Sequence, residues 1–486
     1  MTSSSTSWST VAAPTELATR VKEAWRWGCA LPQLTQDAYL YACSCAFAAL
    51  TAVFAVSADY RAWGQMAALA YGSAALLCAV AAAMQRRATE RPSRRHLNLD
   101  NFRRAVLLSL VLGVVVAPLG AELAWRAAGD PGAHAQPEVA VIERAGDRAA
   151  VPTSPYLTSP NNVGISPSSD NKRLDASSFF PYLPGMVVFG LPSAFSASAA
   201  LGDARLPLVG FTLLVVALAL ATSGGALRRR ARVLQFLVVL PFGALPMVTG
   251  GDDLPVLALT LFGLVLAARR QPVAAGLALG LAATLKFTAW PVLLLLLFAV
   301  RDPKDRPAAG RYGLAAGVVA LPVILFGALT NPRGFFENVV RFPLGLAHVR
   351  SPAASPLLGQ MLTNLFPSER RVITALLGLV GVAIVAVVLA RRPPRTPAAV
   401  AGFTAFALAL ATVLAPATRF GYLIYPANLA VWALVLPSVS GQRRAQSASS
   451  TSNNRNESEL EPAGVSPLRA GVIEGLEPST FTPTSQ

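Results

Sequence analysis

The stretch Gln271–Val300, QPVAAGLALGLAATLKFTAWPVLLLLLFAV, decides the fold of the rest of the chain. It is apolar apart from Lys286, and basic residues flank it, with Arg269 and Arg270 before it and Arg301 after it. Basic loops favour the cytoplasmic side of a membrane, so both ends are expected there. The chain must therefore cross outward and return, and the stretch is short for two full crossings at ~1.5 Å per residue. We predict two short helices that meet near Lys286.

The composition extends this prediction to the whole chain. Of the 486 residues, 53% are hydrophobic and 14% are charged, whereas soluble domains carry about 25% charged residues. Many apolar runs approach the ~20 residues that a membrane-spanning helix needs. We predict an all-α integral membrane protein, a polytopic bundle of about twelve transmembrane helices. The net charge of +16 comes mostly from Arg clusters in short loops, so membrane topology explains it better than nucleic-acid binding.

The Arg clusters also assign sides to the loops. A basic loop at about 85–104 is expected in the cytoplasm, so the next helix leads outward and delivers a long polar loop, 126–205, to the exterior. Within that loop, the apolar segment 181–198 is predicted to be interfacial or re-entrant, because a crossing there would place the Arg228–Arg232 cluster outside. Besides the hairpin, spans are predicted at about 38–57, 63–84, 105–125, 206–224, 233–249, 254–268, 312–329, 372–390, 397–416 and 422–437.

This topology divides the chain into four parts with both termini in the cytoplasm. They are a cytoplasmic tail at 1–37, two helices with a basic loop at 38–104, a transmembrane catalytic body at 105–437 and a disordered tail at 438–486. The start of the chain lacks the basic and apolar pattern of a signal peptide. The cysteines and histidines have no ligand spacing, so neither a His- or Cys-based metal site nor a disulfide framework is expected.

The long loop contains the candidate general base. Glu138 follows Pro137 and opens an apolar, helix-like run, and a carboxylate there could take a proton from an acceptor hydroxyl. The alternative is an ordinary exterior carboxylate. Glu143 is a second candidate, although it could simply pair with Arg144.

Charged residues elsewhere could bind a phosphate or a sugar. Lys286 lies in an apolar hairpin, where a cation is costly; it either contacts a lipid-borne phosphate or extends to the membrane interface. Arg419 is a second candidate for the phosphate, and Tyr422 either binds substrate or anchors the last span. Asp252 and Asp253 form either a solvated helix cap or part of an acceptor, sugar or divalent-metal site, for which no third ligand is evident.

Several segments resemble a known family. GLALGLAATLKFTAWPVLLLLL (Gly276–Leu297), preceded by GGDDLPVLAL, resembles the bacterial polyprenol-phosphate-mannose-dependent enzymes of glycosyltransferase family 87. FGYLIYPANLAVWALVLP (Phe420–Pro437) resembles the last span of that family, and EVAVIERA, SPY and FPYLPG resemble its first exterior loop. The resemblance covers roughly 105–437. It implies a GT-C fold, a lipid-phosphate sugar donor, an exterior active site and Glu138 at the position of the catalytic Asp of the family.

The chemistry agrees with that resemblance. An exterior transferase needs a lipid-borne donor, whose leaving phosphate requires cations, and one carboxylate base suffices for an inverting attack. We therefore predict a mannosyltransferase-like enzyme of the bacterial cytoplasmic membrane. Its expected partners are membrane lipids, a polyprenyl-phosphate sugar and a glycolipid or polysaccharide acceptor. No cofactor beyond this donor is expected, with a divalent metal left open. The alternative is a secondary transporter or a flippase for lipid-linked intermediates, because broken helices with an intramembrane charge also occur in transporters.

Overall fold

The computed structural model describes most of the chain between residues 31 and 436. The predicted tails, 1–37 and 438–486, therefore lie largely or wholly outside the described residues, as do Arg91, Arg94 and Arg95 of the basic loop. The described residues are 31–90, 98–129, 134–151, 153–156, 178–223, 227–301, 305, 307–344, 346–347 and 353–436.

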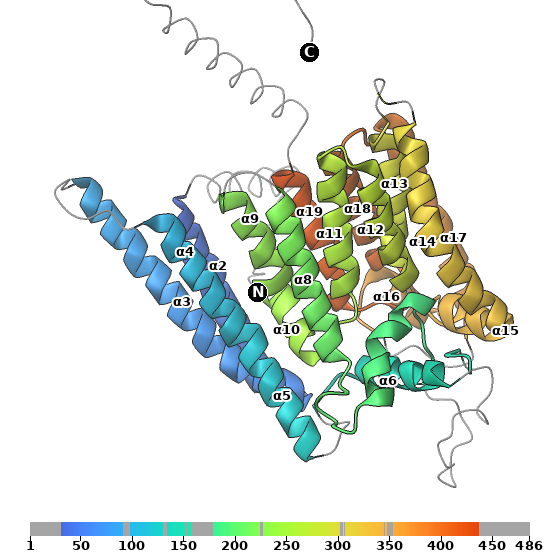
Figure 1. The fold of residues 1–486 in the computed structure, drawn as a ribbon, viewed down its shortest axis with the longest axis horizontal. Coiled ribbons are helices and arrows are strands. Elements are labelled where there is room, and N and C mark those ends of the chain that lie inside the picture. The colour runs from blue at the N-terminus through green and yellow to red at the C-terminus, as the bar shows by residue number, and fades with distance from the viewer. Residues whose placement is uncertain are drawn as a thin grey trace, which may run out of the picture. The chain divides into compact units, whose positions relative to one another are not determined.

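Helices make up nearly all of the described structure, which contains no strand and one isolated bridge, between Ala354 and Thr418. The first three helices pack together in the order of the chain (Figure 1). They are α2 (Gln33–Phe54), α3 (Ala58–Glu90) and a continuous helix formed by α4 (Leu99–Val111), η1 (Leu112–Val116) and α5 (Ala117–Ala128). Gly64 allows α2 and α3 to approach closely, because a Cβ there would lie 2.5 Å from the backbone nitrogen of Ala52.

The long loop then folds against the ends of the helices. Its helix α6 (Pro137–Ala150) lies across the lower ends of the bundle helices in Figure 1 and packs against η4 (Pro184–Gly190) and α7 (Leu191–Phe195). The segment η4–α7 is too short to span a membrane, which agrees with the prediction for 181–198. Helix α8 (Arg205–Ser223) returns along the bundle. The next span is broken at Leu240 and bends by 43°; it is formed by α9 (Leu227–Leu234), η5 (Gln235–Val239) and α10 (Pro241–Thr249).

The hairpin has the predicted form of two short helices. Helix α11 (Leu254–Ala268) leads to α12 (Pro272–Leu285), which ends at Lys286, where the backbone is extended. After η6 (Phe287–Ala289), α13 (Trp290–Ala299) packs against α12. Gly276 and Gly280 bring α12 close to α14 (Ala308–Thr330), because a Cβ on either glycine would lie within 2.7 Å of a backbone oxygen of α14. This pair forms the close packing face that small residues four apart allow.

The last third of the chain adds three more long or medium helices. Helix α17 (Arg370–Arg391) has no buried residue, whereas α18 (Pro397–Leu414) and α19 (Ile424–Val435) pack closely on each other. The shorter elements of this part are α15 (Pro332–Phe335), η7 (Phe336–Arg341), α16 (Leu358–Leu365) and η8 (Phe420–Leu423).

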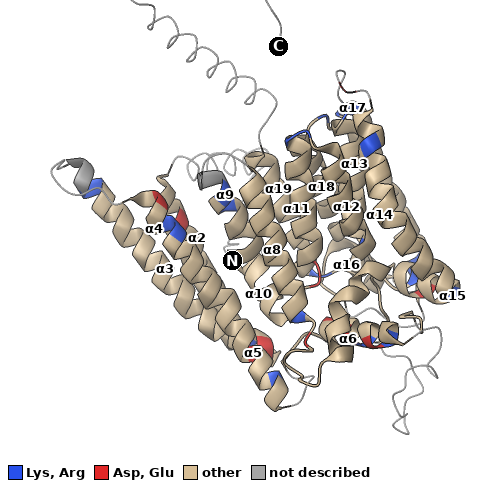
Figure 2. Ribbon diagram, viewed as in Figure 1, with Lys and Arg blue, Asp and Glu red and all other residues tan. Residues whose placement is uncertain are grey.

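The expected number of spans is not confirmed. Seven of the described helices are long and apolar enough to cross a membrane, or eight if the bent α9–α10 pair is one span. The shortfall arises because α11, α12, α13 and η8–α19 are apolar but shorter than 18 residues. Figure 2 shows charged residues along α6 and basic segments at the opposite ends of the long helices, beside α13 and α17.

Candidate active site

Helix α6 presents one face to the protein and carries Glu138 at its start. Gln136 is the N-cap residue and Pro137 occupies the first turn, where its fixed φ and missing N–H are tolerated. Val139 and Ile142 are fully buried, as expected for the inner face of an amphipathic helix. Glu138 lies in the first turn, where the helix dipole favours a carboxylate.

Glu138 forms an ion pair with Arg419, which lies 281 residues further along the chain, just before η8. Nη1 of Arg419 is 2.5 Å from Oε1 of Glu138. Burial lowers the pKa of Arg419, but the charge of Glu138 outweighs it, so the pKa is raised and the guanidinium stays charged. Oε2 of Glu138 is buried and has no hydrogen-bond partner among the described residues. The carboxylate thus has one oxygen occupied and one available.

Lys286 forms a second ion-pair cluster with the turn between α10 and α11. Its Nζ lies 2.7 Å from Oδ2 of Asp252 and 2.5 Å from Oδ1 of Asp253. The Lys286 side chain is only 15% exposed, and its ammonium group contacts both carboxylates. Asp252 is buried as well, and burial raises the pKa of its carboxyl although Lys286 opposes the shift. Asp252 is therefore a buried, ion-paired residue, whereas Asp253 is the half-buried N-cap residue of α11 and pairs with the same lysine.

Tyrosines connect the two clusters. The Tyr425 hydroxyl donates to Oδ1 of Asp253 at 2.7 Å, and Nζ of Lys286 lies 5.1 Å from the centre of the Tyr182 ring. Burial raises the pKa of Tyr182 well above its ordinary value, and the charges of Asp252 and Glu138 act in the same direction. Tyr422 interacts electrostatically with both Lys286 and Arg419. The structure therefore brings all the predicted site residues together in one place, except Glu143.

This constellation can bind an anion and accept a proton. Two cations, Lys286 and Arg419, lie beside a partly unsatisfied carboxylate, Glu138, and phenol hydroxyls surround them. In the described part of the chain, no three His, Cys, Asp or Glu side chains lie together in a group that could hold a metal ion.

Comparison with known proteins identifies the family. Residues 180–417 match the model of glycosyltransferase family 87. The chain belongs to this family. No curated protein and no solved structure matches the chain. Membership makes the protein a membrane glycosyltransferase.

The family region does not contain the whole site. It includes Asp252, Asp253 and Lys286, but it begins after Glu138 and ends just before Arg419. In this family 87 protein, Glu138 thus comes from the segment before the matched region and its counter-ion Arg419 from the segment after it.

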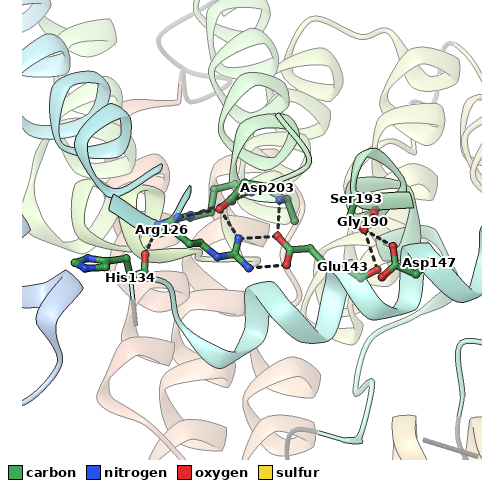
Figure 3. A network of polar contacts seen from close by, with 9 residues as sticks. Arg126, His134, Glu143, Asp147, Gly190, Ser193 and Asp203 are labelled. Carbon is green, nitrogen blue, oxygen red and sulfur yellow. Dashed lines mark hydrogen bonds and ion pairs between the residues drawn. The ribbon is translucent and has the colours of Figure 1, made fainter. Parts of the chain in front are cut away.

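Glu143, the second predicted base, belongs to a different ion-pair network (Figure 3). Arg126 donates to both of its oxygens, at 2.8 Å to Oε1 and 2.7 Å to Oε2, and the backbone N–H of Ala204 donates to Oε1. Arg126 also pairs with Asp203, which in turn binds Arg205. The charges of Arg205 and Arg126 lower the pKa of Asp203 in spite of its burial. We name these four side chains the Arg126 network; it leaves neither oxygen of Glu143 available.

Sequence reasoning missed residues that hold the site in place. Arg126 and Arg205 lie at the ends of apolar helices, where the pattern indicated only topology, although Arg205 is fully buried and donates to the carbonyls of His134 and Val248. Tyr182 was part of a quoted motif but was assigned no role. Arg205 lies two positions after Asp203 at the start of α8, and both its backbone N–H and its guanidinium donate to that carboxylate.

Proposed function

We propose that the protein transfers a sugar, with mannose as the first candidate, from a polyprenyl-phosphate donor to a hydroxyl of an exterior lipid or polysaccharide acceptor. The observation that supports this most is the state of Glu138. Arg419 occupies one of its oxygens, and the other is buried without a partner among the described residues. A buried carboxylate oxygen without a hydrogen bond is energetically costly, so a substrate hydroxyl is a suitable partner for it.

In this proposal Glu138 is the general base. Its Oε2 takes the proton of the acceptor hydroxyl while the acceptor oxygen forms a bond to the anomeric carbon. The bond from that carbon to the phosphate oxygen breaks, and the phosphate leaves with the electron pair. Attack opposite the leaving group inverts the anomeric centre, and one carboxylate suffices for it.

Lys286 and Arg419 bind the donor phosphate and stabilise the charge that develops as it leaves. In the structure both cations are paired with carboxylates. A phosphate that contacts Arg419 competes with Glu138 for the guanidinium. Donor binding thus releases Glu138 from its ion pair with Arg419 and leaves the carboxylate free to contact the acceptor hydroxyl.

Asp252, Asp253 and Tyr422 are proposed to contact hydroxyl groups of the sugar or the acceptor. Their side chains lie beside Lys286, where the sugar next to the phosphate would sit. Carboxylates and phenols can accept and donate the hydrogen bonds that distinguish one sugar from another.

The site is proposed to face the exterior of a bacterial cytoplasmic membrane. The basic segments at the opposite end of the bundle support this orientation (Figure 2). A reporter fused after Ala127 is expected to read exterior, and one fused after Arg391 cytoplasmic. The opposite result at Ala127 would place the site inside and remove the reason for a lipid-borne donor.

The decisive experiment supplies radiolabelled polyprenyl-phosphate mannose to membranes that contain the protein and measures label in lipid and polysaccharide fractions. Transfer that depends on the protein is expected. The bent α9–α10 span is also a feature of transporters, but the family match favours transfer. Solute uptake that follows expression, without transfer of label, would support the transporter alternative.

A further inference from the structure

Tyr60 of α3, a helix that precedes the family region, contacts the candidate site, although sequence analysis assigned it no role. Tyr60 lies in the first turn of α3, and its hydroxyl accepts a hydrogen bond of 2.5 Å from Nε2 of Gln136. Gln136 is the N-cap residue of α6, two positions before Glu138. The Tyr60 hydroxyl is also close enough to Glu138 and Arg419 to interact with both charges.

Gln136 connects this hydroxyl to the turn that holds Lys286. Its Nε2 also donates to Oγ1 of Thr249 at 2.9 Å, and its backbone N–H donates to the Thr249 carbonyl at 2.9 Å. Thr249 is fully buried at the end of α10, three positions before Asp252. Gln136 therefore connects the start of α6, which carries Glu138, to the start of the turn between α10 and α11, which carries Asp252 and Asp253.

Helix α6 and this turn approach each other closely at Gly250. Gly250 has φ of 121°, a conformation that favours glycine, and a Cβ there would lie 2.1 Å from Cγ2 of Val139. The first turn of α6 thus packs directly on the backbone of the turn. The Gln136 side chain fixes the remaining freedom, the rotation and depth of this helix end.

We propose that Tyr60 is a positioning residue for transfer: it orients Gln136, and through Gln136 it fixes Glu138 relative to the aspartate–lysine cluster. The inference rests on the proposed function, because it assigns Tyr60 a role in the step that Glu138 performs. It makes the helices at 33–128, which lie outside the family region, part of the active-site architecture. A displacement of about 1 Å at a reacting group can lower a rate by roughly two orders of magnitude.

The test compares Tyr60→Phe with Tyr71→Phe. Both lie on α3, and the Tyr71 hydroxyl donates to the carbonyl of Val239, so the control also loses a hydrogen bond of the same helix. With labelled polyprenyl-phosphate mannose, Tyr60→Phe is expected to lower kcat about 10-fold with little change in the donor KM, as loss of a supporting hydrogen bond typically does. Tyr71→Phe is expected to retain kcat. Equal kcat values for the two variants and the wild type would overturn the inference.

A second comparison separates positioning from an independent effect. In a Glu138→Gln background the residual transfer should not fall further on Tyr60→Phe, because the base that Tyr60 positions is already absent. A further 10-fold loss in that background would overturn the inference. If Tyr60→Phe does not fold, Gln136→Met, which keeps the size and removes both donated bonds, is judged by the same criteria. Normal transfer by Glu138→Gln itself would instead refute the proposed base.

Discussion

Helix α6 carries two glutamates, five residues apart, that have opposite surroundings. Both oxygens of Glu143 accept hydrogen bonds from Arg126, and Asp203 and Arg205 complete a network in which every charge has a partner. Glu138 has a partner at one oxygen only, and its second oxygen is buried without one in the described part of the chain. A carboxylate whose two oxygens both accept hydrogen bonds within the protein contributes to structure. A carboxylate with one oxygen that lacks such a bond can still accept one from a substrate.

The two clusters also differ in the origin of their residues. The Arg126 network joins the end of α5, the middle of α6 and the start of α8, which all lie within residues 126–205. The cluster around Glu138 and Lys286 joins α6, the α10–α11 turn, the end of α12 and the segment before η8. The first holds the long loop on the helices that flank it. The second combines residues from 138 to 419, so it brings together segments from most of the described chain.

The strongest test of this contrast is Glu138→Gln, which keeps the volume of the side chain and removes the base. We expect turnover to fall by roughly 10²–10⁴-fold, the usual contribution of a general base. Expression and the melting temperature in detergent should stay close to those of the wild type, because the amide can still accept a bond from Arg419. Labelled-sugar transfer and thermal unfolding are the two measurements.

The control for Glu138→Gln is Glu138→Asp, which changes the same side chain but keeps the carboxylate. Glu138→Asp retains a base on a shorter side chain and should recover part of the transfer. Full activity of Glu138→Gln would mean that the base lies elsewhere, and Asp252 and Asp253 would be the next residues to replace.

Sequence reasoning succeeded where local pattern determines the outcome. The break at Lys286 followed from basic flanks and a length of 30 residues, and the packing of α12 on α14 followed from Gly276 and Gly280. The segment near Pro184 is too short to be a candidate span, as the Arg cluster on the next loop predicted. In each case the evidence lies within one stretch of the chain.

It failed where the outcome depends on partners far apart in sequence. Nothing near Asp252 and Asp253 indicated that Lys286, more than 30 positions away, would remove them from solvent. The partner of Glu143 is Arg126 and not its neighbour Arg144 as one alternative supposed. The predicted number of spans is not confirmed, because apolar helices such as α11 and α13 are shorter than 18 residues.

Lys286→Met tests the second part of the active cluster and should have an intermediate effect. The donor loses a phosphate contact, and we expect kcat/KM for the donor to fall roughly 10–100-fold, as for a single charge-assisted contact. Two buried carboxylates also lose their cation, so the melting temperature should drop, because an unpaired buried charge is strongly destabilising. Donor titrations and thermal unfolding measure the two effects.

A double variant separates these two effects. Adding Asp252→Asn to Lys286→Met removes one unpaired charge and should recover part of the melting temperature without restoring donor use. Recovery of transfer together with stability would show that Lys286 acts only on folding. An unchanged donor KM in a stable Lys286→Met protein would likewise remove Lys286 from the phosphate site.

The smallest effect on transfer is expected for Glu143→Gln, and it determines whether the contrast along α6 is real. The amide oxygen can still accept one bond from Arg126, and Arg126 keeps Asp203, so transfer should stay within about threefold of the wild type. The melting temperature should fall, because a bidentate charged pair becomes a single neutral bond. Arg126→Met should lower it further, since it leaves both Glu143 and Asp203 without that cation. The opposite outcome would be that Glu143→Gln abolishes transfer at an unchanged melting temperature while Glu138→Gln is active. Glu143 would then be the base, and its ion pair with Arg126 would have to break when substrate binds.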